Sequence, residues 1–305
     1  MTMSKPVDPV IKWSGSKRKI APVLSRLLPE ATCYFEPFVG SGAMLPFRPC
    51  PKGVAGDIIP ELIALWVKIR DVPDEVIEEY ECRWKRLQTE GHTAYYEIRN
   101  DFNTTRNAHD FLFLTRTCVN GLIRFNHNGD FNNSLHHSRP GIAPGRLRKL
   151  VFQWSYAIQD VTFLAADYRN TLETAGKNDL VFLDPPYEGT RGRYQPKAFD
   201  FDDFFSELER LNQLEAKWIL TLDGNAGKRK YATSIPNVLY QVQLGLTTGN
   251  SPFTKLMKTS LDSVVESVYL NFVPPTEALN QVLNGGHKKA SSVTALNMHQ
   301  NRLFD

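Results

Sequence analysis

The chain has 305 residues, enough for one large α/β domain with a smaller inserted one, and 42% of them are apolar, as in ordinary globular proteins. No apolar run of membrane-spanning length and no hydrophobic signal segment is found, so we expect a cytoplasmic protein that is not inserted in a membrane. Four cysteines without paired spacing argue against a disulfide framework and a metal site, and a net charge of +3 is too small to indicate a nucleic-acid partner by itself.

The first motif is a Gly-Ser turn flanked by an aromatic ring and four cations, from Ile11 to Lys19. On these residues alone it is equally compatible with a basic loop that caps the helix predicted from about Pro22 to Leu28. The segment from Tyr34 to Ala43 then predicts a strand that leads into a turn with two glycines. Glycines at alternate positions allow a ligand to approach the backbone closely, as in the first turn of a Rossmann-like unit.

A second strand is predicted at Val54–Asp57, and it ends in a carboxylate. Nucleotide-binding folds place the acid that binds ribose hydroxyls at about this distance from the glycine turn. No Gly-Lys-Ser/Thr phosphate motif follows. A nucleoside-containing cofactor without a pyrophosphate therefore fits better than a dinucleotide.

Apolar residues recur at helical spacing from about Ile58 to Val119, and these aromatics are expected in the core. The composition then changes to Asn, Gly, His and Arg between Asn120 and Lys149. Between residues 116 and 149 there are six cations (Arg116, Arg124, Arg139, Arg146, Arg148, Lys149) and one acid, Asp130. Asn and Arg suit base edges, and His and Lys suit phosphates, which predicts a DNA-binding face; a solvated polar loop is the alternative. Asn128-Gly129 predicts a hairpin turn within it.

After a strand at Val161–Leu164, the stretch Val181 to Tyr187 is a short apolar strand followed at once by Asp184-Pro185-Pro186-Tyr187. Two prolines remove backbone donors, so the carbonyl groups here stay available at the carboxyl edge of the sheet, where open α/β sheets bind ligands. The Asp184 carboxylate and the Pro185 carbonyl form a two-acceptor clamp for an exocyclic amino group, and Tyr187 offers a stacking face. Asp-Pro alone would more often be a simple turn.

Beyond this motif the sequence predicts a basic loop at Arg191–Gln195, where a phosphate could sit, and an amphipathic helix from Phe204 to Leu214. A strand is predicted at Trp218–Leu222, and Val264–Val273 is expected to be a final edge strand. A short helical piece after Pro275 is then expected to give way to a disordered tail.

Taken together, these motifs resemble the Dam-like (D12 class, α-group) DNA adenine N6-methyltransferases, with a central region similar to EcoRV-type members. The matching residues span about positions 11 to 272 in the family's order, with the cofactor motif first, the recognition region next and the catalytic motif last. They are Lys12 to Lys17, Glu36 to Gly42, Gly56-Asp57, Tyr95 to Arg99, Asn120 to Asn126, Gly129 to Asn132 and Asp184 to Tyr187. Val119 and Asn133-Ser134 depart from the pattern, in place of an aromatic residue and a Val-Pro pair found in some members, which leaves the recognition sequence open.

The resemblance implies S-adenosylmethionine as the cofactor and double-stranded DNA as the partner, with no obligate protein partner. The catalytic residues would be Asp184, Pro185, Pro186 and Tyr187. The cofactor site would comprise Trp13, Lys17, Glu36, Phe38, Gly40, Gly42, Asp57, Asp167, Tyr168 and Asp184. Arg124 and Leu122 fall where the family touches bases, and with the basic loops the candidate DNA contacts are Asn120, Leu122, Arg124, Asn126, Asn128, Asn132, Arg139, Arg191 and Arg193.

The expected fold is α/β: a Rossmann-like class I methyltransferase sheet from residues 1–57 and 151–273, interrupted by a mainly helical recognition domain at 58–150 that carries a β-hairpin. Residues 274–305 would be a flexible tail. The expected activity is methylation of a flipped adenine, whether in restriction-modification or another setting. A cytosine-N4 methyltransferase and a non-catalytic DNA-binding protein are the alternatives. The terminal segment Gln300–Phe304 also resembles peptides that bind bacterial sliding clamps.

Overall fold

The computed structural model describes residues 7–136, 138, 141–186, 199–226, 229–230, 235–250, 263–284 and 293–298. Its helices are α1 (Ala21–Leu24), α2 (Pro60–Asp71), α3 (Pro73–Glu90), α4 (His92–Thr105), α5 (Ala108–Thr117), α6 (Pro144–Ala157), α7 (Tyr168–Thr171), α8 (Phe201–Gln213) and α10 (Thr276–Asn284). Its strands are β1 (Tyr34–Glu36), β2 (Gly53–Asp57), β3 (Val161–Ala165), β4 (Leu180–Leu183), β5 (Lys217–Ala226), β6 (Arg229–Lys230), β7 (Val242–Asn250), β8 (Ser263–Leu270) and β9 (Val293–Met298). Within these residues, no helix is both long enough and apolar enough to cross a bilayer.

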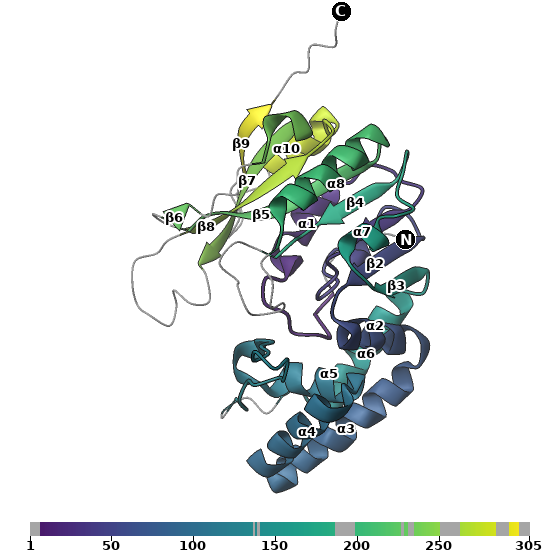
Figure 1. The fold of residues 1–305 in the computed structure, drawn as a ribbon, viewed down its shortest axis with the longest axis vertical. Helices are drawn as coiled ribbons and strands as arrows, with labels where there is room; N and C mark the ends of the chain where they lie inside the picture. Colours follow the sequence, from purple (N-terminus) through teal and green to yellow (C-terminus); the bar gives the residue numbers. More distant parts are fainter. Residues whose placement is uncertain are drawn as a thin grey trace, which may run out of the picture.

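The strands join in one mixed sheet in the order β3-β2-β1-β4-β5-β8-β7-β9, with β6 paired to β5 (Figure 1). The first five strands in this order run parallel, whereas β8, β7 and β9 are attached by antiparallel pairing. The chain starts in the middle of the sheet, moves outward to β3 and returns to β4, so the order reverses between β1 and β4. Ligands bind open α/β sheets at such a switch point. The predicted α/β class with a Rossmann-like sheet is confirmed.

Both faces of the central strands are buried, which explains why they are continuously apolar. In β4, Leu180 and Phe182 belong to one core cluster and Val181 and Leu183 to another. The second cluster includes Leu208 of α8, and α8 covers that face of the sheet (Figure 1). Side chains alternate along a strand with a period of two, so one short apolar run supplies both cores.

Helices α2 to α6 gather at one end of the molecule, below the sheet in Figure 1. The sheet is joined to them by three aromatic rings. Trp66 of α2 lies parallel to Phe163 of β3, with ring centroids 6.0 Å apart, and meets Trp154 of α6 at 5.0 Å. Trp66 and Trp154 are almost fully buried. Aromatic packing of this kind stabilises the junction between the two parts.

The end of the sheet differs from the prediction in two ways. The expectation that Val264–Val273 forms an edge strand is wrong, because β8 lies between β5 and β7. Val268 and Leu270 of β8 are fully buried, as an interior position requires. Where a disordered tail was expected, Val293–Met298 form β9, the outer strand beside β7. The short helix expected after Pro275 is present as α10.

Candidate active site

The carboxylate of Asp184 lies directly after β4, at the carboxyl edge of the parallel strands. Its Oδ1 atom is 2.9 Å from Lys17 Nζ and accepts a hydrogen bond from Thr221 Oγ1 at 3.0 Å. Pro185 is buried and Pro186 half-buried behind it. The predicted strand and its terminal acid are therefore in place, whereas Tyr187 lies outside the described residues.

A buried cation links this carboxylate to β8, two strands away from β4 in the sheet. Lys17 is only 4% exposed, and its Nζ atom lies 2.9 Å from Asp184 Oδ1 and 3.7 Å from Oε2 of Glu266, a residue of β8. The ammonium group also donates to the Gly15 carbonyl at 3.3 Å. An ammonium between two carboxylates is the arrangement in which a buried charge is tolerated.

The turn after β1 is bound to the end of β2 through Asp57. The Gly40 N–H donates to Asp57 Oδ2 at 3.2 Å, and the Ile59 N–H donates to Oδ1 at 3.2 Å. Gly40 has a φ of 44°, and a Cβ there would lie 2.8 Å from the indole nitrogen of Trp13. Glycine is required at this point because the backbone is left-handed and the ring of Trp13 lies against it. Burial raises the pKa of Asp57 to about 6.

Glu36 at the end of β1 is a buried carboxyl group. Its Oε2 atom accepts a hydrogen bond from the Tyr34 hydroxyl at 3.0 Å. Burial raises the pKa of Glu36 from its ordinary value of 4.5 to about 8, opposed by the Tyr34 hydrogen bond and reinforced by the negative charge of Asp184. Glu36 is therefore held as a neutral acid at neutral pH.

This neutral acid has a consequence for stability. A raised folded-state pKa contributes stability that is fully present below the ordinary pKa and is lost as the pH rises through about 8. Between about pH 5 and pH 9, we expect the free energy of unfolding of the wild type to fall, relative to Glu36→Gln, by on the order of a few kcal/mol. Thermal melting across this range measures the difference. Glu30→Gln, at an exposed position, should follow the wild type at every pH; a Glu36→Gln variant that also does so would contradict the prediction.

Aromatic rings pack together beside the turn that follows β1. Phe38 stacks on Tyr168 with ring centroids 5.5 Å apart, and Phe199 packs against both. The Asp167 carboxylate caps α7 by accepting from the Arg169 N–H at 3.1 Å. Phe38, Asp167 and Tyr168 were predicted from separate parts of the sequence, and the Phe38–Tyr168 contact brings the first and last of them together.

The predicted recognition segment forms a tight antiparallel loop closed by an isolated bridge between Phe125 and Phe131. Asn126 shapes this loop, because its Oδ1 accepts from the N–H groups of Asn128 and Asp130, both at 2.9 Å. Gly129 has a φ of 83°, as a left-handed turn position requires. The predicted Asn-Gly turn thus lies at the tip.

Among the predicted DNA contacts, Asn120, Arg124 and Asn128 are exposed, and Leu122 and Asn132 are half-buried. Arg124 donates from Nε to Asn132 Oδ1 at 2.8 Å. The positions 139, 191 and 193, predicted as arginine contacts, lie outside the described residues.

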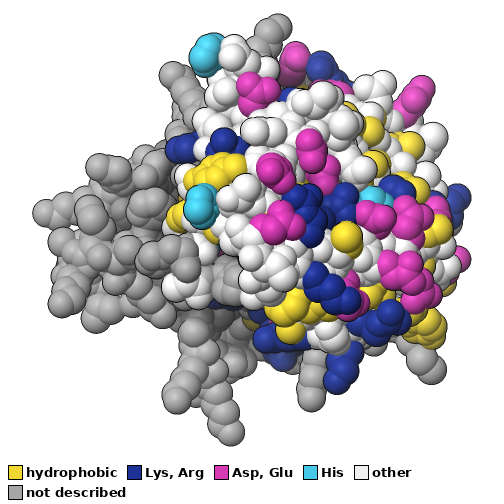
Figure 2. Space-filling view, turned by 90° about the horizontal axis from the view of Figure 1, so that it is seen from below, with side chains coloured by type: hydrophobic (Ala, Val, Ile, Leu, Met, Phe, Trp, Pro, Cys, Tyr) yellow, Lys and Arg dark blue, Asp and Glu magenta, His cyan; other side chains and the backbone are white. Residues whose placement is uncertain are grey.

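The basic face expected from the charge count is smaller than predicted. Arg116 is buried and donates to the Pro9 carbonyl at 3.0 Å. Arg146 and Arg148 lie on α6 and form ion pairs with Asp8 and Asp74. Seen from the helical end, Asp and Glu lie among the described Arg and Lys side chains over much of the surface, and several Lys and Arg side chains gather at its lower edge (Figure 2).

Sequence reasoning missed two residues at the end of α4, Asn103 and the following Arg106, that hold this loop. Asn103 accepts from the Phe131 N–H at 2.7 Å and donates to the Phe131 carbonyl at 3.2 Å. Arg106 donates to the Gly129 carbonyl at 2.6 Å and lies over the rings of Phe102 and Phe125. The hydrogen bonds of Asn103 and Arg106 join residues more than twenty positions apart, so no local sequence pattern predicts them. Thr221 and Glu266 of the Asp184 cluster were missed for the same reason.

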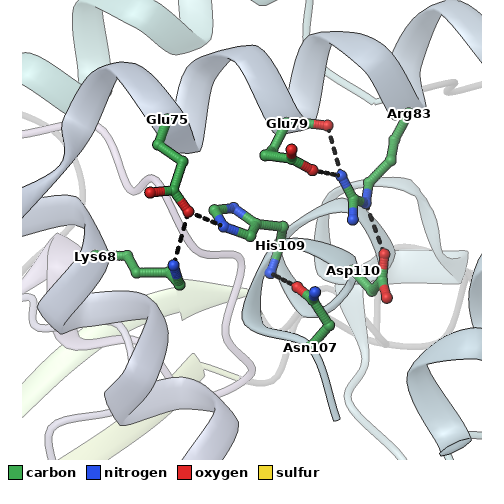
Figure 3. Close-up of polar contacts among 7 residues, drawn as sticks. All are labelled: Lys68, Glu75, Glu79, Arg83, Asn107, His109 and Asp110. Atoms are coloured by element: carbon green, nitrogen blue, oxygen red, sulfur yellow. Dashed lines mark hydrogen bonds and ion pairs between the residues drawn. The ribbon is translucent and has the colours of Figure 1, made fainter. Parts of the chain in front are cut away.

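A second polar cluster lies between α2, α3 and α5 (Figure 3). His109 Nε2 lies 2.9 Å from Glu75 Oε1, which also accepts from Lys68. Arg83 bridges Asp110 and a carboxylate one turn earlier on α3. Burial lowers the pKa of His109. Within the part of the chain that the structure describes, no group of His, Cys, Asp and Glu side chains could hold a metal ion. The contacts of Glu75 with Lys68 and His109, and of Arg83 with Asp110, join the three helices.

Comparison with known proteins gives a consistent result. Residues 13–231 match the family model described as D12 class N6 adenine-specific DNA methyltransferase. The Retron Ec67 DNA adenine methylase of Escherichia coli is 32% identical over 201 residues, which cover 64% of this chain and 68% of that protein. The DNA adenine methylases of Salmonella typhi and Haemophilus influenzae are each 30% identical, over 58% and 59% of this chain and 64% and 63% of their own lengths. This chain thus spans slightly less than two thirds of the latter two relatives.

Proposed function

The chain belongs to the D12 class N6 adenine-specific DNA methyltransferases, and from this premise we propose that it methylates the N6 amino group of a target adenine in double-stranded DNA, with S-adenosylmethionine as the methyl donor. The observation that carries the proposal is the place of Asp184. It follows a buried strand at the carboxyl edge of the sheet, and two donors hold its Oδ1 atom.

The chemistry of the residues around the switch point fits this cofactor. A carboxylate at the end of β2 suits ribose hydroxyls, and Asp57 is held there by two backbone N–H groups. The rings of Phe38 and Tyr168 offer a flat surface for a base. We assign the cofactor site to Trp13, Lys17, Glu36, Phe38, Gly40, Gly42, Asp57, Asp167, Tyr168 and Asp184. When bound, S-adenosylmethionine supplies the methyl group as a sulfonium.

In the proposed reaction the target adenine leaves the helix, because its amino group cannot be reached inside the duplex. The Asp184 carboxylate and the Pro185 carbonyl would each accept a hydrogen bond from the target amino group. These bonds would turn the nitrogen lone pair out of conjugation and toward the methyl group that the bound cofactor would supply, and the nitrogen would lose one proton to solvent as it gains the methyl group. Tyr187 would stack on the extruded base. The protein contributes positioning and electrostatics in this scheme.

We assign DNA recognition to the loop from Asn120 to Asn132. Arg124 is exposed, and its Nε donates a hydrogen bond to the side chain of Asn132. This bond orients the guanidinium group. Arginine in this situation suits a guanine edge, because it can donate two parallel hydrogen bonds. Arg139, Arg191 and Arg193 are assigned to phosphates on sequence grounds alone.

The experiment incubates the full chain with S-adenosylmethionine carrying a labelled methyl group and unmethylated double-stranded DNA, and then digests the DNA to nucleosides. We expect the label in N6-methyldeoxyadenosine. Label in N4-methyldeoxycytidine would identify a cytosine-N4 enzyme. DNA binding without any labelled nucleoside would identify a non-catalytic binding protein. Sequencing of methylated positions in DNA from expressing cells would give the recognition sequence.

The segment Gln300–Phe304 lies outside the described residues, so its resemblance to clamp-binding peptides stays a prediction. A pull-down with a bacterial sliding clamp, using the full chain and a variant without the last six residues, tests it. Loss of capture on truncation would support the segment as the binding peptide, and equal capture would exclude it.

A further inference from the structure

We propose that Thr221 is a positioning residue that, together with Lys17, holds the Asp184 carboxylate in the orientation that receives the target amino group. The inference rests on the proposed function and adds to it a residue that no sequence motif marks. Thr221 lies on β5, and its hydroxyl is 3.0 Å from Asp184 Oδ1. Lys17 Nζ lies 2.9 Å from the same oxygen.

The register of the sheet places this hydroxyl. Strands β4 and β5 run parallel with Leu183 opposite Leu220, so Thr221 comes beside Asp184 one residue later. Leu220 and Leu222 belong to the core cluster on the α8 side, and alternation turns the side chain of Thr221 to the other face. The Asp184 carboxylate therefore contacts a side chain, that of Thr221, whose position is fixed by the pairing of β5 with β4.

The burial of the Thr221 hydroxyl indicates that it needs a hydrogen-bond partner within the protein. Thr221 is fully buried, and a valine of nearly the same shape would fill this space without a polar group. A hydroxyl in such a position destabilises the fold unless it is hydrogen-bonded. It has one hydrogen to donate, and the Asp184 oxygen at 3.0 Å is nearer than the Leu183 carbonyl at 3.3 Å.

Two donors on one oxygen restrict how the carboxylate can turn. Rotation of the Asp184 carboxylate about its Cβ–Cγ bond would take Oδ1 away from both the Thr221 hydroxyl and the Lys17 ammonium. Glu266 on β8 holds the ammonium from the other side at 3.7 Å. The strands β5 and β8 are adjacent in the sheet, so Thr221 and Glu266 support the carboxylate from neighbouring strands. This is how a catalytic group is held within the narrow geometry that transfer requires.

The test compares Thr221→Val, which removes the hydroxyl and keeps the shape, with Thr221→Ser, which keeps the hydroxyl. A hydrogen bond to a charged group is worth enough to lower kcat by roughly 10- to 100-fold when it is lost. We expect this fall in Thr221→Val with less than about a threefold change in KM for DNA and cofactor, because the bond acts on the reacting geometry. Thr221→Ser should restore kcat to within roughly threefold of the wild type.

Thr117→Val is the matched control. Thr117 is also fully buried, and its hydroxyl donates to a helix carbonyl, that of Phe113, at 2.7 Å. It should keep the wild-type kcat, and melting curves confirm that each variant is folded. Should Thr221→Val fail to fold, Thr221→Ala takes its place beside Thr221→Ser.

Each result has one meaning. An active wild type with an equally active Thr221→Val overturns the inference and leaves the proposed function standing. Equal losses in Thr221→Val and Thr221→Ser also overturn it, because the hydroxyl would then not be responsible. A wild type that methylates no adenine overturns the proposed function itself, and the positioning role falls with it.

Discussion

Replacing Asp184 with alanine is expected to lower methyl transfer by on the order of 10³-fold or more while the protein remains folded. The variant removes the charged acceptor of the target amino group, and the backbone carbonyl of Pro185 cannot replace it. Activity is measured as labelled methyl transferred to DNA per enzyme per minute. Melting curves show whether the variant is folded, and cofactor binding shows how much of the cofactor site depends on Asp184.

Asp74→Ala serves as the control for this variant. Asp74 is an exposed acid in the first turn of α3 and forms a surface ion pair with Arg148. Its loss should leave transfer at the wild-type level, because exposed pairs contribute little. Asp184→Ala with wild-type activity would refute the assignment of the catalytic carboxylate.

The second large effect is expected for Lys17→Met, which keeps most of the side-chain length and removes the charge. The ammonium is buried between Asp184 at 2.9 Å and Glu266 at 3.7 Å. Its removal leaves two neighbouring carboxylates without their shared cation, and breaking a buried pair from one side costs about 3–5 kcal/mol. We expect the free energy of unfolding to fall by about this amount in urea denaturation, and methyl transfer to fall with it.

A double variant separates charge from packing. Lys17→Met combined with Glu266→Gln should recover part of the lost stability, because one of the two uncompensated charges is then gone. Lys19→Met, at an exposed position in the same turn, should leave stability within about 0.5 kcal/mol of the wild type. If the double variant is less stable than Lys17→Met, the two side chains do not interact as proposed.

Many of the strands, turns and helices could be predicted because short runs of adjacent residues determine them. The run Val181 to Leu183 before Asp184 marks a buried strand and its end, and the glycines at 40 and 42 mark the turn after β1. Each signal needs only a few adjacent residues. The amphipathic helix predicted at Phe204–Leu214 is likewise present as α8.

The rest depends on pairing between distant strands. Thr221 reads as an ordinary strand residue until β5 is aligned with β4. The sequence predicts Val264–Val273 as a final edge strand, yet β7 and β9 lie outside β8. The Ser/Ala/Asn composition near β9 suggests disorder, and only its pairing with β7 gives it a structure. Composition describes a segment by itself and carries no information about the partner that completes it.

The two carboxylates that contact Lys17 lie far along the chain from it, since Asp184 follows β4 and Glu266 lies in β8. During synthesis a ribosome would release β1 to β4, with the glycine turn and Asp57, long before β8 emerges. A nascent chain would then contain Asp184 and Lys17 but not yet Glu266. The complete arrangement around the Asp184 carboxylate would form only after β8 has been translated. Pairing of this long range is slow to form, so the ability to modify DNA should appear late in maturation.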